Sequence, residues 1–265
     1  MDEDAVVTAD WLATTLDDVR VVDVRDAWEY DGIGHVPGAV NIPFDAFRAE
    51  EGAEGMLPSA DDWAELLGEA GITADDTVVA YDDTHGVFAA RFLVTALLYG
   101  HEDLHLLNGD FSAWQREHEV SQQAPDVEQT TYEVRKPEAT PLVGADEVAA
   151  AREDDDAVLV DTRDPEEYEA GHIPGAVNLD WRELVDEETR GLKDRAEVGA
   201  ILDDRGIVPE KRIVLYCNTA RRISHTYVVL RWMGYEDVAF YEGSLTAWLR
   251  EGREVTGDVT VEDVR

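Results

Sequence analysis

The sequence predicts an α/β protein made of two repeated domains, each a mostly parallel sheet flanked by helices. Three observations lead to this prediction. Short apolar runs typical of buried strands alternate with stretches of helical periodicity, which is the pattern of a parallel sheet covered on both faces. A set of motifs occurs twice in the chain. The length of 265 residues is enough for two hydrophobic cores.

The repeat is carried by three pairs of segments. Residues 23–41, DVRDAWEYDGIGHVPGAVN, recur as residues 161–178, DTRDPEEYEAGHIPGAVN. Residues 78–82, VVAYD, match residues 213–217, IVLYC, and residues 109–114, GDFSAW, match residues 243–248, GSLTAW. The offset of about 135 residues indicates a duplicated domain rather than a short-period repeat protein.

In the first repeat, residues 19–24 and 77–81 are predicted strands because they are short, apolar and rich in β-branched residues. Residues 61–70 and 88–98 have helical periodicity, and Gly100 is expected to end the second of these helices.

In the second repeat, residues 157–161, 212–216 and 238–241 are predicted strands by the same criteria. Residues 223–233 are a predicted helix that ends at Gly234. Alternation of strands and helices in both repeats predicts parallel pairing within each sheet.

The composition predicts a first domain over residues 1–122, a linker over residues 123–141 and a second domain over residues 142–265. The linker segment is polar and contains Pro125, Pro137 and Pro141. We expect it to cross the protein surface.

The charge is strongly acidic, with 60 acidic and 22 basic residues and a formal net charge of −38. Self-repulsion on this scale destabilises a compact state at low ionic strength, and salt screens it. The carboxylates are spread over both repeats, which favours adaptation to a saline cytoplasm over an acidic patch for a basic partner. Nucleic acid is not expected as a partner because its phosphates would be repelled.

The beginning of the chain, Met1-Asp2-Glu3-Asp4, is acidic where a signal peptide is basic, and no early apolar stretch has the length of a membrane span. We expect a cytoplasmic two-domain monomer without membrane association. The single cysteine excludes an internal disulfide, and the seven histidines lack ligand spacing. Neither a metal nor another cofactor is expected.

Cys217 lies where the apolar run 213–216 gives way to a polar loop that leads into the predicted helix. Reactive groups of α/β proteins lie at such strand ends, beside the unpaired N–H groups of the following helix. These N–H groups and two nearby arginines favour a thiolate. The alternative is an inert, buried cysteine. The position after the run, rather than inside it, favours a reactive thiol outside the core.

Asp82 stands in the first repeat where the second repeat has Cys217. It has no sulfur with which to attack a donor, and its carboxylate would repel an anionic one. The first repeat is therefore expected to be catalytically inactive.

The paired Asp-x-Arg and His-x-Pro-Gly-Ala-Val-Asn segments, together with the strand ending in Tyr216-Cys217 and the motif Glu242-Gly243-Ser244 with Trp248 after it, resemble the rhodanese family. The resemblance covers nearly the whole chain. The loop from Cys217 to Thr226 is most similar to the microbial tandem branch, thiosulfate sulfurtransferases with an inactive first domain and an active second one.

The resemblance implies a double displacement at Cys217. The thiolate takes the outer sulfur of thiosulfate, sulfite leaves, and the resulting persulfide is passed to a thiophilic acceptor such as cyanide or a thiol. Backbone N–H groups of the loop are expected to stabilise the persulfide charge, and an arginine is expected to hold the oxyanion end of the donor. The predicted substrate-binding residues are Asn218, Thr219, Ala220, Arg221 and Arg222.

The residues of the loop are expected to have different roles. Arg222 matches the loop arginine of the family, whereas Arg221 is equally compatible with a solvated surface position. Asn218 and Thr219 are expected to act through their backbone. Outside the loop, Asp161 and Arg163 are expected to form a structural ion pair, and His172 and His225 to be packing residues.

Two departures from the family leave the donor open. Thr219 and Glu167 stand where animal thiosulfate enzymes have a lysine and an arginine, respectively. The loop arginines favour thiosulfate; 3-mercaptopyruvate is the alternative donor, and a non-catalytic persulfide carrier is the alternative outside enzymes. A phosphatase of the same fold needs its arginine at the sixth place after the cysteine, where this chain has Ile223, so that activity is disfavoured.

Overall fold

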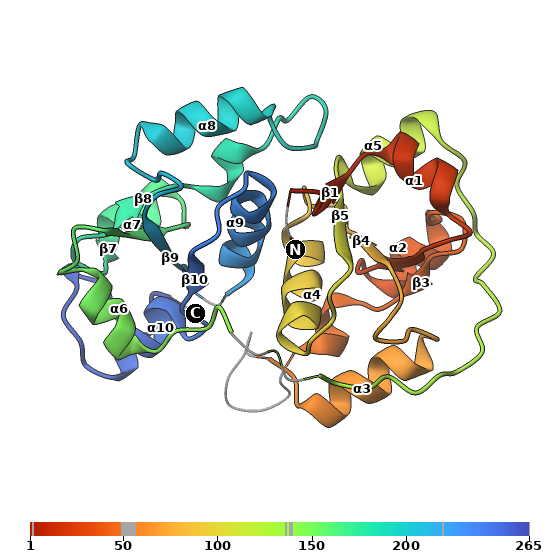
Figure 1. Ribbon diagram of the computed structural model, residues 1–265, viewed down its shortest axis with the longest axis horizontal. Helices are drawn as coiled ribbons and strands as arrows, with labels where there is room; N and C mark the ends of the chain where they lie inside the picture. Colours follow the sequence, from red (N-terminus) through yellow and green to blue (C-terminus); the bar gives the residue numbers. More distant parts are fainter. Residues whose placement is uncertain (2, 49–56, 136, 138–139, 219, 265) are drawn as a thin grey trace. The chain divides into compact units, whose positions relative to one another are not determined.

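The computed structural model describes residues 1, 3–48, 57–135, 137, 140–218 and 220–264, which fall into two compact units (Figure 1). The first unit comprises Met1–Thr140 and Asp186–Leu192, and the second comprises Pro141–Val185 and Lys193–Arg265. Each unit is a parallel sheet with helices on both faces, so the predicted α/β class is confirmed.

The first unit contains a sheet with the strand order β1-β5-β4-β2-β3, in which every pair is parallel. Its strands are β1 (Val6–Val7), β2 (Arg20–Asp23), β3 (Val40–Asn41), β4 (Val78–Tyr81) and β5 (Leu104–Leu107). Asp23 pairs with Tyr81, so the residues after β2 and β4 emerge at the same carboxyl edge.

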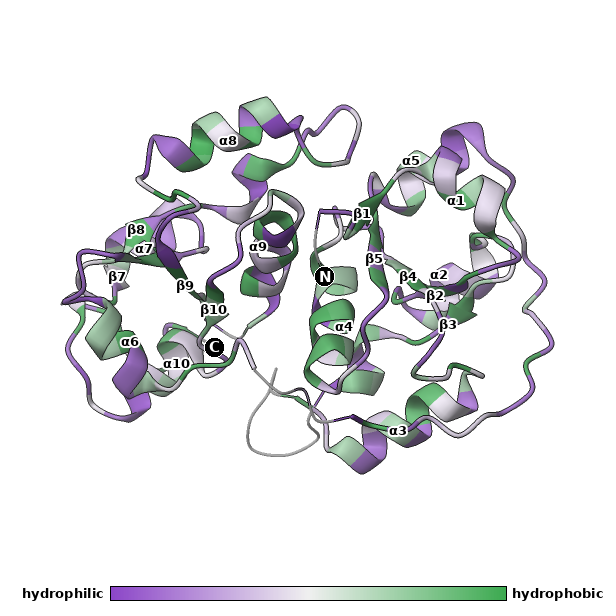
Figure 2. Cartoon of the chain, in the orientation of Figure 1, coloured by the Kyte–Doolittle hydropathy of each residue, from purple (hydrophilic) through white to green (hydrophobic). Residues whose placement is uncertain are grey.

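Helices cover both faces of this sheet. One face carries α1 (Ala9–Thr15), α2 (Ala27–Gly32) and α5 (Asp110–Glu117), whose Leu12, Tyr30 and Trp114 share a core cluster with strand residues. The other face carries the 3-10 turn η1 (Phe44–Phe47), α3 (Ala60–Glu69) and α4 (Val87–Leu98), joined by ring contacts of Phe47, Trp63 and Phe92. Figure 2 shows α4 as apolar along most of its length, which fits its burial.

The second unit repeats this plan with the parallel strand order β10-β9-β6-β8. The strands are β6 (Ala157–Asp161), β8 (Val177–Asn178), β9 (Arg212–Tyr216) and β10 (Val238–Phe240), and β7 (Gly171–His172) pairs antiparallel with β11 (Thr256–Gly257).

The helices of the second unit also lie on two faces of its sheet. Residues of α6 (Ala145–Ala151), α7 (Pro165–Ala170) and α10 (Ser244–Arg250) pack in one core cluster with β6, β9 and β10. The helices α8 (Arg195–Asp203) and α9 (Arg221–Trp232) both contact the 3-10 turn η2 (Trp181–Leu184). As predicted, α4 and α9 end next to Gly100 and Gly234. Each glycine lies two residues after the last helical residue and has a positive φ.

The segment predicted as a linker is partly packed. The N–H of Thr130 donates to the carbonyl of Gly68, the N–H of Arg135 donates to that of Tyr99, and Tyr132 is buried. The first unit accordingly extends to Thr140.

A short stretch between η2 and α8 belongs to the first unit. Within Asp186–Leu192, the guanidinium of Arg190 binds the buried carboxylate of Asp110, with Nε 2.9 Å from Oδ1. The N–H of Leu192 donates to Asn108 Oδ1 at 2.8 Å. The pairing of Arg190 with Asp110 was not predicted from the sequence.

Among the helices of the described residues, none is both long and apolar enough to cross a bilayer.

Candidate active site

Cys217 lies at the carboxyl edge of the second sheet, directly after β9. Three residues separate it from Arg221, the first residue of α9. The register of β6 against β9 pairs Asp161 with Tyr216, so the Asp161–Arg163 segment ends at the same edge as Cys217. The predicted arrangement of strand, loop and helix is therefore present.

The thiol is buried, and the expectation of a cysteine outside the core was wrong. Cys217 is 1% exposed. The start of α10 packs over it: the N–H of Cys217 donates to Ser244 Oγ at 3.2 Å, its carbonyl accepts from the N–H of Leu245 at 2.9 Å, and Ser244 Oγ lies 3.9 Å from Sγ. A strand end is covered here by a segment 27 residues away in the sequence, which local patterning does not reveal.

The first repeat shows what its loop binds. The carboxylate of Asp82 accepts four backbone N–H bonds: Oδ1 from Thr84 at 2.7 Å and Gly86 at 2.8 Å, and Oδ2 from Phe88 at 2.8 Å and Ala89 at 3.0 Å. Burial raises the pKa of Asp82, while these N–H bonds act to lower it. The loop and the first turn of α4 thus form an anion-binding cradle that the protein's own carboxylate fills.

The two loops have features in common and one difference: Gly86, with a φ of 86°, precedes α4, whereas its counterpart Arg221 is already the first residue of α9. Ala220 has a φ of 68°, and His85, at the same place in the first repeat, has a φ of 56°. The N–H of Leu245 donates to the carbonyl of Cys217 and the N–H of Phe111 to that of Asp82, each at 2.9 Å. Cys217 therefore takes the place of Asp82 in an equivalent loop. By the sequence offset, the residues corresponding to the Asp82 donors are Thr219, which lies outside the described residues, and Arg221, Ile223 and Ser224.

The predicted donor-binding residues have different surroundings. Ala220 is buried and Arg221 is exposed, while Thr219 lies outside the described residues. Arg222 Nη1 forms an ion pair with Glu167 Oε2. The structure therefore gives Arg222 a carboxylate partner on α7.

Asn218 takes part in the same cluster through its side chain, not only through its backbone. Its Nδ2 donates to Glu167 Oε1 at 2.7 Å, and its Oδ1 accepts from Arg163 Nη1 at 3.5 Å. Glu167 therefore contacts residues on both sides of the stretch 219–221.

The structural ion pair between Asp161 and Arg163 is confirmed. The Nη2–Oδ2 distance is 2.6 Å, the side chains are 0% and 1% exposed, and Arg163 Nη2 also donates to the Gly171 carbonyl at 2.7 Å. Burial and the negative charge of Asp161 raise the pKa of Tyr216 well above 10.0. This buried network holds the segment 161–163 in place beside Asn218 of the loop.

The two histidines expected to be packing residues do pack. His172 stacks on Tyr168 at 3.9 Å between ring centroids, and His225 is buried with its ring against Trp181 at 5.1 Å.

Two further residues belong to the site and were missed as site residues. Ser244 was seen only as part of a repeated motif, although its hydroxyl contacts Cys217. Glu167 was noted only because it stands where animal thiosulfate enzymes have an arginine, although it binds Asn218 and Arg222. The repeat alignment was the available signal for both, since each matches a defined position of the first repeat.

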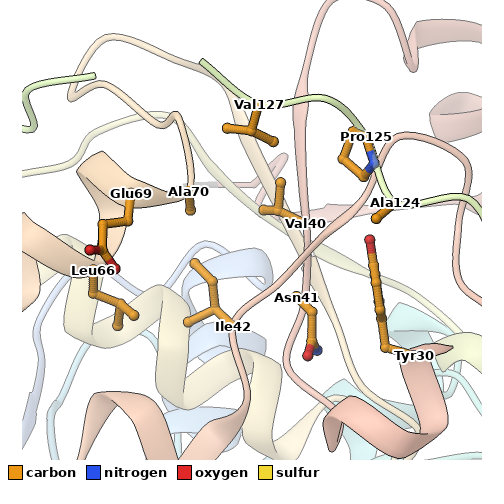
Figure 3. A pocket seen from close by; sticks show the side chains of 10 residues that line it. All are labelled: Tyr30, Val40, Asn41, Ile42, Leu66, Glu69, Ala70, Ala124, Pro125 and Val127. Atoms are coloured by element: carbon orange, nitrogen blue, oxygen red, sulfur yellow. The ribbon is translucent and has the colours of Figure 1, made fainter. Parts of the chain in front are cut away.

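Two cavities lined by described residues of the first unit have no cysteine in their lining. One, of about 230 Å³, opens beside the Asp82 loop and is lined by Asp26, Glu29, Asp45 and Asp83 among others, which would repel an anionic donor. The other, of about 320 Å³, is shown in Figure 3; its lining from β3, α3 and residues 124–127 is mostly apolar, with Glu69 at its rim. These surroundings agree with an inactive first repeat.

Comparison with known proteins identifies the class. The rhodanese-like domain family matches this chain twice, over residues 8–117 and 144–251. A thiosulfate sulfurtransferase of Pseudomonas aeruginosa is 35% identical, covering 86% of this chain and 87% of the relative. The sulfur carrier protein TtuD of Thermus thermophilus is 32% identical, covering 92% and 93%.

A solved structure agrees with this result. The 3-mercaptopyruvate sulfotransferase SseA of Escherichia coli superposes with a TM-score of 0.80 at 28% identity, covering 91% of this chain and 98% of SseA. The chain belongs to the rhodanese family, in its tandem-domain form, and its class of activity is sulfur transfer.

Proposed function

We propose that this chain transfers sulfane sulfur from thiosulfate to a thiophilic acceptor through a persulfide on Cys217. The thiolate attacks the outer sulfur of thiosulfate, the S–S bond of the donor breaks, and sulfite leaves with the bonding electron pair. Cyanide or a thiolate then attacks the outer sulfur of the persulfide, and the Cys217 thiolate is restored.

The observation that carries this proposal is the pair of equivalent loops. In the first repeat, four N–H groups bind the carboxylate of Asp82. In the second repeat, Cys217 occupies that position and brings no oxygen of its own. A negatively charged sulfur at this place would be stabilised by backbone N–H groups in the same way as the carboxylate of Asp82, which supports an anionic thiolate and persulfide.

The loop also argues against phosphoryl chemistry. The sixth place after the cysteine is Ile223, which is buried in α9, and the arginine at the fifth place is paired with Glu167. The loop therefore has no guanidinium at the sixth place, where a phosphatase of this fold needs one.

The burial of Cys217 sets a requirement on the mechanism. At 1% exposure the sulfur is not open to a donor until neighbouring groups move. Persulfide formation therefore requires a displacement of the loop or of the start of α10.

The test is a mass measurement of the protein after incubation with thiosulfate in molar potassium chloride. We expect one added sulfur on Cys217, its loss on addition of cyanide, and equivalent formation of thiocyanate. Cys217→Ser should abolish both products while keeping the circular dichroism spectrum. Thiocyanate formation by Cys217→Ser at the parent rate would refute the proposal.

Two alternatives have specific support. The pairing of Arg222 with Glu167 reduces the positive charge at the loop, which favours the monoanionic donor 3-mercaptopyruvate. Resemblance to a protein named as a sulfur carrier favours delivery to a protein acceptor. Faster sulfur transfer from 3-mercaptopyruvate than from thiosulfate would establish the first alternative. Persulfide formation without turnover to small thiophiles would establish the second.

A further inference from the structure

Glu167 on α7 links the two sides of the active-site loop. Its Oε1 accepts from Asn218 Nδ2 at 2.7 Å, and its Oε2 pairs with Arg222 Nη1. Asn218 directly follows Cys217, and Arg222 is the second residue of α9. A single carboxylate therefore neutralises the loop arginine and binds the residue beside the nucleophile.

The first repeat has a glutamate at the same place with a different partner. Glu29 matches Glu167, but its Oε2 accepts from the N–H of Asp26 at 3.2 Å and caps its own helix. The loop of the first repeat has Asp83 and Val87 where the second has Asn218 and Arg222. The glutamate thus contacts the loop in the repeat that carries the cysteine.

The exposure of this pair separates it from a purely structural one. The side chains of Arg222 and Glu167 are 31% and 27% exposed, whereas those of Arg163 and Asp161 are fully buried. A partly exposed ion pair contributes little to folding. The negative charge of Glu167 nevertheless lies beside the loop that holds Cys217, where it repels an approaching anion.

We propose that Glu167 is a specificity-determining residue that sets the charge of the sulfur donor; this inference rests on the function proposed above. Its carboxylate pairs with Nη1 of the Arg222 guanidinium and adds a negative charge beside the Cys217 loop. Thiosulfate carries two negative charges and 3-mercaptopyruvate carries one. Glu167 therefore weakens thiosulfate binding more than 3-mercaptopyruvate binding. It reduces the preference for thiosulfate that the loop arginines alone would give.

The first experiment compares kcat/KM for the two donors in the parent protein and in Glu167→Gln. Glutamine keeps an oxygen for Asn218 and removes the charge. We expect the thiosulfate to 3-mercaptopyruvate ratio to rise about tenfold, equivalent to about 1.4 kcal/mol, and to rise less in molar salt. Glu29→Gln is the matched control and should leave the ratio unchanged, and Glu167→Asp, which keeps the charge, should stay near the parent ratio.

A loss of loop shape alone would lower kcat/KM for both donors equally and leave the ratio unchanged. That result, or a fall in the ratio, overturns the proposal.

A second experiment separates this inference from the proposed function. Thiosulfate binding is measured by calorimetry on Cys217→Ser protein with and without Glu167→Gln, where no sulfur transfer takes place. We expect about tenfold tighter binding without the carboxylate. Equal affinities, or no binding by either protein, overturn the role of Glu167. Tighter binding combined with no persulfide on Cys217 in the parent protein would contradict the proposed function alone.

Discussion

The substitution Asp82→Asn tests whether the loop of the first repeat is held together by an anion. Asparagine has nearly the same size, so the change acts on charge and hydrogen bonding rather than on packing. The parent carboxylate accepts four backbone N–H bonds of 2.7 to 3.0 Å, two at each oxygen. An amide has one acceptor oxygen, and its NH₂ group faces two of these donors.

The size of the effect follows from those bonds. Two N–H groups lose their acceptor, one buried and one partly buried, and the cost for a buried group is about 1–3 kcal/mol. Removing a buried charge offsets part of this cost, because burial raises the pKa of Asp82 and the ionised form is disfavoured to that extent. We expect a net loss of about 2–3 kcal/mol, which lowers the Tm of the first unit by roughly 5–10 °C.

The assay is calorimetric unfolding in molar potassium chloride, with Asp75→Asn as the control. The side chain of Asp75 is 80% exposed, and its pair with Arg135 is also at the surface. The control should shift the unfolding free energy by no more than about 0.5 kcal/mol. An Asp82→Asn protein as stable as the parent would refute the reasoning, because the four N–H groups would then not depend on a carboxylate.

Three further predictions concern the second loop, the tyrosines and the net charge. Ser244→Ala should slow persulfide formation on Cys217 roughly tenfold in a stopped-flow assay, because its hydroxyl lies 3.9 Å from Sγ; an unchanged rate would exclude that role. Burial raises the pKa of eight of the nine tyrosines, so folded stability from the neutral phenols is complete below pH 10 and is lost as the pH rises through the raised values. Phenolate absorbance of the folded protein at about pH 11 should therefore be a minor fraction of that of the unfolded chain, and near-complete ionisation would contradict this. The Tm should rise as potassium chloride goes from dilute to molar, because the net charge of −38 is screened, and a flat response would count against salt adaptation.

Sequence reasoning located the long elements well because their signals are local. The strands at 157–161 and 212–216 coincide with β6 and β9, and the helix predicted at 88–98 coincides with α4 to within one residue. Two-residue strands such as β1 and β3 were not predicted, since two residues carry no periodicity. Their existence depends on pairing with a longer neighbour.

The site was predictable in position but not in its contacts. The strand end and the repeat alignment placed Cys217 in a loop equivalent to that of Asp82. Its burial depends on Ser244, and the pairing of Arg222 depends on Glu167, which lies 55 residues earlier in the chain. Such long-range partners are set by the topology of the sheet, which local patterns do not contain.

The replacement of cysteine by aspartate in the first repeat is therefore more than a loss of the nucleophile. Loop amides held at positive φ and at a helix N-terminus have no partner within the helix, and a buried N–H without an acceptor is costly. Asp82 supplies the acceptor permanently, so the first loop is satisfied by its own side chain. Cys217 supplies only a weak acceptor in the second loop, and a charged sulfur on it is a stronger one. The same backbone thus stabilises the fold in one repeat and, on our proposal, the reaction intermediate in the other.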